Sequence, residues 1–96
     1  MILSFANTPT KTEQIWNGQR SRRVPLDIQT RGLAKLALLN AADVLDDLRN
    51  PPGNRLHDLK DDRAGQHSIS INKQWRICFR FKDGNAYDVE IIDYHD

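Results

Sequence analysis

The spacing of apolar residues changes near Arg55, and this change limits the chain to folds in which helices come before strands. After Arg55 the apolar residues recur at every second position, as in strands with one buried face. The alternation is clear in residues 75–81 and is repeated in residues 69–71 and 87–91. Asp83-Gly84 is a strong hairpin signal between two of these runs. The pattern therefore predicts a meander of antiparallel strands.

The strand predicted over residues 75–81 has two unlike faces. Its apolar face consists of Trp75, Ile77, Phe79 and Phe81. Its other, mostly basic face consists of Arg76, Cys78, Arg80 and, just beyond the run, Lys82. We expect helices to pack on the apolar face, which leaves the basic face to solvent or to a ligand. In the strand after the hairpin, Tyr87, Val89 and Ile91 are expected to share one face.

Before Arg55 the sequence has helical features. Thr8-Pro9 predicts the start of a first helix, with Thr as its cap and Pro at its first position. Thr10 and Glu13 also have capping-box spacing, which leaves the start open by a residue or two. Gly18 is expected to end this helix. The preceding segment, Ile2–Phe5, is short and apolar, which suits an edge strand.

Pro25 predicts the start of a second helix. The helix face expected in the core consists of Leu26, Leu33, Leu36 and Ala37. A shorter helical segment contains Val44, Leu45 and Leu48 and ends at Pro51-Pro52-Gly53, which cannot continue a helix. These features predict an α+β fold in which N-terminal helices pack on a C-terminal antiparallel sheet.

Length and composition exclude several classes of protein. A chain of 96 residues suits a single domain spanning residues 1–96. No apolar run approaches the roughly 20 residues of a membrane-spanning helix, and residues 1–5 lack the features of a signal peptide. We therefore expect a cytoplasmic protein without a membrane partner. The single cysteine, Cys78, excludes an internal disulfide and offers no paired spacing for zinc.

Basic residues are concentrated in one stretch, although the formal net charge is only +1. The basic residues of this stretch are Arg20, Arg22, Arg23, Arg31 and Lys35. Asp27 is the acidic residue between them. Such a run is typical of a solvated surface or of a contact with nucleic acid, and the pattern alone leaves both interpretations open.

Three segments carry side chains that could cleave RNA without a metal ion. The reaction needs a base for the 2′-hydroxyl, an acid for the leaving 5′-oxygen and positive charge on the phosphate. Groups of these kinds are offered by His57, by Arg76 with Arg80, and by Asp93-Tyr94-His95. Taken alone, each also has an ordinary interpretation as an exposed or terminal residue.

All of these residues except Arg80 lie in segments that resemble the HigB branch of the RelE/ParE toxin superfamily. The similarity covers nearly the whole chain and is densest between residues 51 and 95. The matching strings are Pro51-Pro52-Gly53-Asn54-Arg55-Leu56, Leu56-His57-Asp58-Leu59-Lys60, Asp62-Arg63-Ala64-Gly65-Gln66-His67-Ser68-Ile69, Gln74-Trp75-Arg76-Ile77-Cys78-Phe79 and Asp93-Tyr94-His95. The order and spacing of these strings, within so short a chain, are shared with few other protein families.

The resemblance implies a compact RelE-like α+β fold and a specific activity. The protein would be the toxin of a type II toxin–antitoxin system, a ribosome-dependent endoribonuclease that cleaves messenger RNA and inhibits translation. The implied active site has no metal and no cofactor, and it consists of His57, Asp93, Tyr94 and His95, with charge from Lys60 and Arg76. Whether His57 or His95 is the general base stays open.

The resemblance also implies partners. These are the ribosome, messenger RNA and a HigA-like helix-turn-helix antitoxin that neutralises the toxin and represses the shared operon. The residues expected to contact RNA or the ribosome are Arg20, Arg22, Arg23, Lys35, Arg80 and Lys82. Contacts of this kind to phosphates are independent of base sequence and weaken with salt.

Two positions depart from the family pattern. Asp58 stands where family members commonly have Pro, and Asp61 stands where they commonly have Gly. Because Asp tolerates left-handed turn conformations, we expect the turn to survive. The added negative charge near a phosphate site would weaken catalysis.

Two other functions remain open at this point. A ParE-like relative would act on DNA gyrase and would not be a nuclease, although His57 and residues 93–95 argue against it. A non-catalytic RNA-binding module would use Arg76, Arg80 and Lys82 to hold a backbone, and it would bind RNA without cleaving it.

Overall fold

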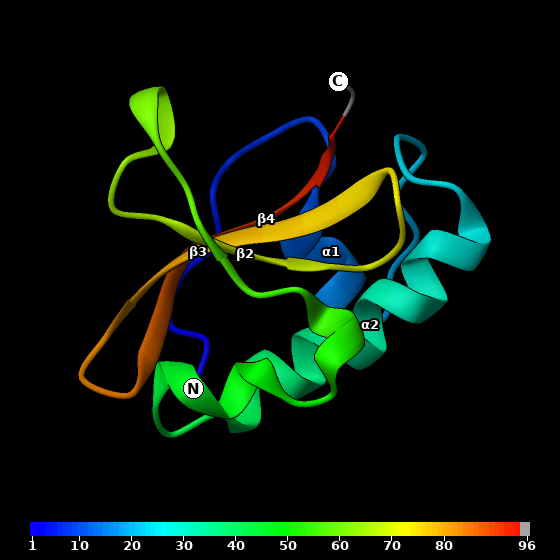
Figure 1. Cartoon of the computed structure of the whole chain (residues 1–96). Helices are drawn as coiled ribbons and strands as arrows, with labels where there is room; N and C mark the ends of the chain where they lie inside the picture. The colour runs from blue at the N-terminus through cyan, green and yellow to red at the C-terminus, as the bar shows by residue number, and fades with distance from the viewer. Residues whose placement is uncertain (95–96) are drawn as a thin grey trace.

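A four-stranded antiparallel sheet forms the centre of the computed structural model, which describes residues 1–94 (Figure 1). The strands are β1 (His57–Asp58), β2 (His67–Ser70), β3 (Trp75–Lys82) and β4 (Asn85–Asp93), in the order β1-β2-β3-β4. Helix α2 (Leu26–Ala41) lies across one face of this sheet. The predicted α+β fold, with helices first and an antiparallel meander after them, is confirmed.

The hairpin between β3 and β4 forms where the sequence predicts it. Asp83 has φ 53° and Gly84 has φ 79°, so both residues of the turn are left-handed. Two left-handed residues give the backbone twist that joins adjacent antiparallel strands most tightly. The Asp-Gly pair therefore sets the register of the two longest strands.

A β-bulge in this hairpin changes which residues of β4 face the core. The register shifts between Cys78 and Arg80, and Asp88 in the facing strand has φ 53°. Because the bulge adds one residue to β4, Ala86 shares the core face with Val89 and Ile91. The prediction that Tyr87 shares that face is wrong, since Tyr87 pairs with Arg80.

Helix α1 (Thr12–Trp16) is shorter than predicted. Thr8 and Pro9 lie in a turn closed by the Lys11 N–H, which donates to the Thr8 carbonyl at 3.1 Å. The helix therefore begins after Pro9, and the predicted cap is wrong. Its end is as predicted, because Gly18 has φ 85° and its N–H donates to the carbonyl of Ile15.

Helix α2 turns a different face to the sheet from the one predicted. Its buried apolar positions are Ile28, Gly32, Leu36 and Leu39, whereas Leu26 is 57% exposed and Leu33 is 38% exposed. A methyl group on Gly32 would lie 3.2 Å from the side chains of Ile71 and Ile91. The helix lies close to the sheet at this glycine, which rotates Leu26, Leu33 and Ala37 outward and leaves Leu36 as the one predicted residue in the core.

Three short 3₁₀ helices lie between α2 and β2, two of them before β1 and one after it. They are η1 (Leu45–Arg49), η2 (Pro52–Asn54) and η3 (Asp61–Arg63). The predicted third helical segment corresponds to η1, which buries Leu48 and leaves the preceding Val44 exposed. Beyond it, the proline-rich segment itself forms η2.

The N-terminal segment lines the outer edge of β4. Ile2 and Phe5 form parallel bridges to Ala86 and Val89, so the predicted edge strand is reduced to two isolated bridges. Further along, the N–H of Ile91 donates to the hydroxyl of the buried Thr12 at 2.8 Å. Within residues 1–94, no helix has the length and apolar character needed to cross a membrane.

Candidate active site and family

A cleft of about 410 Å³ opens on the sheet face opposite α2. Its lining consists of His57, Asp58, Leu59, Lys60, Asp61, Ser68, Arg76 and Tyr94. Four of the six predicted catalytic residues are in this set, although they come from β1, from the following loop, from β3 and from the end of β4. The fold brings together His57, Lys60, Arg76 and Tyr94.

Arg76 connects two walls of the cleft. Its Nη1 donates a hydrogen bond to the hydroxyl of Ser68 at 2.9 Å, and its guanidinium carbon lies 5.4 Å from the centre of the Tyr94 ring. The side chain is half-buried, so these contacts limit its motion. A guanidinium offers five N–H donors, and the bond to Ser68 leaves others for a phosphate in the cleft.

Strand β1 places His57 beside Ser68, its partner in the register. The His57 side chain is exposed to the cleft and to solvent. The neighbouring Asp58 has a partner of its own, because its carboxylate lies 2.7 Å from Nδ1 of His67. The Asp58 carboxylate therefore contacts His67, which takes up part of the negative charge that Asp58 adds beside the cleft.

The loop after β1 contains the second departure from the family pattern. Asp61 has φ 56°, the left-handed conformation that glycine adopts most readily. Asp61 thus has the left-handed turn conformation that an aspartate was expected to tolerate here. The turn leaves Lys60 exposed in the lining of the cleft.

Asp93 is placed differently from the four predicted catalytic residues that line the cleft. Asp93 pairs with Trp75 in the register, and its carboxylate accepts a hydrogen bond from the side chain of Gln74 at 3.0 Å. Asp93 therefore lies next to Tyr94 in the chain but outside the lining of the cleft. His95 lies outside the described residues.

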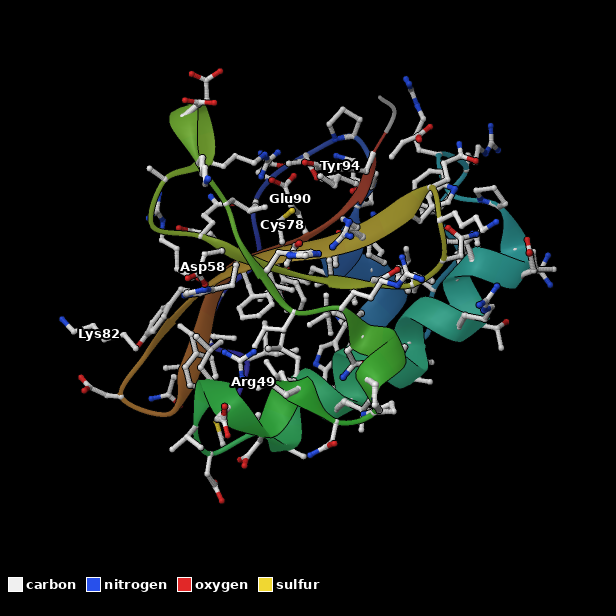
Figure 2. The ribbon with its side chains drawn as sticks, in the orientation of Figure 1. Arg49, Asp58, Cys78, Lys82, Glu90 and Tyr94 are labelled. Carbon is white, nitrogen blue, oxygen red and sulfur yellow. The ribbon has the colours of Figure 1, made fainter. Side chains whose placement is uncertain are left out.

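Beside the cleft, the sheet face that carries Arg76 is closed by an ion pair that the sequence pattern did not indicate. Nη1 of Arg63 lies 2.6 Å from Oε1 of Glu90, which pairs with Cys78 across β3 and β4. Figure 2 shows Cys78, Glu90 and Tyr94 on the side of the sheet away from α2. The expectation that this face is left open is therefore wrong around Cys78, which is fully buried.

Burial also determines the chemistry of Cys78. Loss of solvent raises the pKa of its thiol from 9.0 to about 11. A thiol with this pKa is a poor nucleophile near neutral pH. Cys78 is therefore a small packed residue and not a candidate nucleophile.

The predicted ribosome-binding loop is held in place by one buried side chain. Gln29 donates to the carbonyls of Ser21 and Val24 at 2.8 and 2.6 Å and accepts the N–H of Ser21 at 3.1 Å. The exposed residues presented by this loop are Arg20, Arg22 and Arg23. They border a separate cleft of about 330 Å³, the arginine-loop cleft, together with Pro9 and Lys11.

The other predicted RNA- or ribosome-binding residues are Lys35, Arg80 and Lys82, and they differ in their contacts with the rest of the protein. Lys35 donates to the side chain of the buried Asn54 at 2.5 Å, so its ammonium helps to fix η2 to α2. Arg80 lies 3.5 Å from the carboxylate of Asp88. Lys82 is exposed at the end of β3, away from Tyr94 (Figure 2). None of the three lines the cleft of His57 and Arg76.

Among residues 1–94, no group of three or more His, Cys, Asp or Glu side chains is arranged to hold a metal ion.

The family is established by comparison with known proteins. Residues 8–95 match the family described as the RelE-like toxin of type II toxin–antitoxin system HigB. The chain belongs to this HigB-like toxin family. It is 43% identical over 77 residues to Toxin HigB-1 of Vibrio cholerae serotype O1, covering 80% of each chain. It is also 49% identical over 41 residues to Endoribonuclease HigB of Proteus vulgaris, covering 43% of this chain and 45% of the relative.

The fold itself is shared with solved structures. An Escherichia coli YafQ mutant has a TM-score of 0.61 at 12% identity, covering 97% of this chain and 91% of YafQ. A YoeB–YefM complex from Staphylococcus aureus gives a TM-score of 0.60 at 14% identity, covering 100% of this chain and 97% of the matched chain. At these identities the likeness concerns the fold alone. The resemblance to RelE-superfamily toxins, read from the sequence, is confirmed, and this HigB-like chain is a type II toxin.

Proposed function

We propose that this HigB-like toxin is a ribosome-dependent endoribonuclease that cleaves messenger RNA without a metal ion. We also propose that the whole chain forms a single toxin domain. The observation that carries the proposal is the convergence of His57, Lys60, Arg76 and Tyr94 on one cleft. The name of the Proteus vulgaris relative, an endoribonuclease, supports the same activity.

The proposed reaction is attack of a ribose 2′-oxygen on the neighbouring phosphorus. A base removes the 2′-hydroxyl proton, the new P–O bond forms, and the bond to the 5′-oxygen breaks while an acid protonates that oxygen. The products are a 2′,3′-cyclic phosphate and a 5′-hydroxyl. An imidazole can take or give a proton near neutral pH, so His57 suits either role. His95 or Tyr94 serves as the second group, and Asp93 orients a neighbour.

The cations of the cleft would stabilise the transition state. Negative charge grows on the phosphate oxygens as the new bond forms, and donors fixed in advance stabilise it most effectively. Arg76 is fixed by Ser68 and Tyr94, whereas the exposed Lys60 reaches in from the loop. The ring of Tyr94 offers a surface on which a base can stack.

The proposed partners are the ribosome, its messenger RNA and an antitoxin of the HigA type with a helix-turn-helix. The loop held by Gln29 presents Arg20, Arg22 and Arg23 to ribosomal RNA phosphates, and Arg80 and Lys82 add positive charge on the far end of β3. We retain Lys35 only as a weaker candidate, since it already bonds to Asn54. The proposed location is the cytoplasm, where these partners are.

The test is primer extension on a reporter message in a purified translation system, with and without ribosomes. We expect cuts that require ribosomes and that disappear in His57→Ala and His95→Ala, with a cyclic phosphate at the new 3′ end. Arg49→Ala, a substitution at an exposed position outside the cleft, is the matched control.

Translation of an uncut message would refute the nuclease activity and favour a gyrase-directed toxin or an RNA-binding module. Cleavage by both histidine variants would refute the assigned roles.

A further inference from the structure

A second cleft of about 380 Å³ adjoins the candidate active site and shares Arg76 with it. The cationic side chains that line this cleft are Arg31 from α2, Arg55 after η2, Lys73 from the β2–β3 turn, and Arg76 from β3. Its other lining residues are uncharged. In the first cleft, by contrast, Lys60 and Arg76 are balanced by Asp58 and Asp61. The stronger attraction for a polyanion therefore lies in the second cleft.

The charges of the second cleft are available to a ligand. Within residues 1–94, no carboxylate forms an ion pair with Arg31, Arg55 or Lys73. Three uncompensated cations held near one another repel, and an anion placed among them relieves that repulsion. The arrangement therefore suits a phosphate more than an isolated surface cation would.

The backbone around these cations is fixed by local contacts. Arg55 follows the buried Asn54, whose amide donates to the carbonyls of Leu48 and Asn50. Lys73 lies in a turn closed by Asn72, whose side-chain oxygen accepts the N–H groups of Gln74 and Trp75 at 2.8 and 2.7 Å.

Helix α2 brings the third cation to the same place. Gly32 allows the helix to lie against Ile71, at the end of β2, and Arg31 precedes this glycine. Cations on a fixed backbone hold a strand in one position at a lower cost in entropy than mobile ones do.

We propose that Arg31, Arg55 and Lys73 form a subsite for a backbone phosphate of the messenger RNA strand whose scissile bond lies in the first cleft. This inference rests on the proposed function and adds the path of the substrate. The strand passes from Tyr94 across Arg76 toward the β2–β3 turn, so that Arg76 lies between two successive phosphate positions. The positive and negative side chains of the catalytic cleft are equal in number. The catalytic cleft therefore depends on the adjoining phosphate subsite to retain the RNA strand.

An NMR titration tests the subsite separately from cleavage. The probe is a short single-stranded RNA with 2′-O-methyl groups on every ribose, which cannot be cut. At about 1 mM it exceeds the roughly 10⁻⁴–10⁻⁶ M range of non-specific dissociation constants. We expect the backbone amides of residues 57–60 and of residues 70–76 to shift together.

The test variant is Arg55→Gln/Lys73→Gln, and the matched control is Arg49→Glu, which lowers the net charge by the same amount at one exposed position outside the clefts described above. The test variant should make the slope of log K against log salt less steep by about 0.7, since the subsite holds one phosphate and each phosphate neutralised on a single strand contributes roughly 0.7. The control should change the slope much less.

Each of the other possible outcomes would refute a specific part of the proposal. Shifts at residues 57–60 without shifts at 70–76 would refute the subsite and leave the proposed function standing. Shifts in neither region would refute RNA recognition by both clefts. Shifts at 70–76 alone would refute the continuous path. If the test variant loses sedimentation with ribosomes but binds the oligonucleotide normally, the cations contact ribosomal RNA instead and the proposal is wrong.

Discussion

Arg63 and Glu90 form an ion pair that seals the sheet face beside the candidate active site, with 2.6 Å between Nη1 and Oε1. The Glu90 side chain is 9% exposed, and Arg63 reaches it from the 3₁₀ helix η3. The same guanidinium nitrogen also donates to the side chain of Gln66 at 3.0 Å. The pair therefore fastens the loop that carries Lys60 to β4, and the shape of the cleft depends on it.

Glu90→Ala should destabilise the protein by about 1–3 kcal/mol, because it leaves the partly buried Arg63 without its carboxylate. Urea unfolding measures the change. The control is Asp46→Ala, which breaks the Arg49–Asp46 pair at the same 2.6 Å distance but at side chains that are 66% and 80% exposed. Water screens such a pair, so its loss should cost less than about 1 kcal/mol. Equal losses in the two variants would show that burial of Glu90 contributes nothing.

Cys78 should make stability fall at alkaline pH. Its pKa is 9.0 when exposed and about 11 in the folded protein, so the native state holds the thiol proton more tightly than the unfolded chain does. The stabilisation is complete below pH 9 and is lost as pH rises toward 11, by up to about 1.4 kcal/mol per pH unit. Urea unfolding across this range, compared with Cys78→Ala, isolates the contribution. A native thiol that iodoacetamide alkylates rapidly at pH 8 would contradict the assigned burial.

Gln29→Leu should release the arginine loop without removing any of its charges. The substitution leaves the Ser21 N–H and the carbonyls of Ser21 and Val24 without their partner, at a cost of about 1–3 kcal/mol. Hydrogen exchange should become faster at the amides of residues 21–24, and ribosome association should weaken. Asn17→Leu also replaces a side-chain amide, at an exposed site outside the cleft of these arginines, and serves as the control. Unchanged protection of the loop would refute the role of Gln29.

Local patterns in the sequence predict the meander well, because alternation and an Asp-Gly turn act over a few residues. The wrong predictions concern which side chains face the core, and tertiary contacts determine this. The face of α2 depends on the close approach of Gly32 to Ile71 and Ile91, which apolar spacing does not reveal. The position of Tyr87 depends on a bulge at Asp88, a residue that looks like any exposed polar position in the sequence.

The candidate site was predicted in part for a similar reason. His57, Lys60, Arg76 and Tyr94 were indicated by their order along the chain in a family pattern, and the fold brings them together. Ser68 and Glu90 were missed, although their alternation with apolar neighbours places them on the face of Arg76. The second cleft could not be predicted, since it assembles side chains from a helix, a loop and two strands.

The N-terminal segment along β4 also affects how copies of the chain behave toward one another. An exposed strand edge is a template on which a second molecule can add a strand, and β4 is the longest strand, with nine residues. Its outward N–H groups at Ala86, Val89 and Ile91 are instead occupied by Met1, Ser4 and Thr12 of the same chain. The edge most prone to intermolecular pairing is thereby closed, which protects a protein of this size from aggregating through its own sheet.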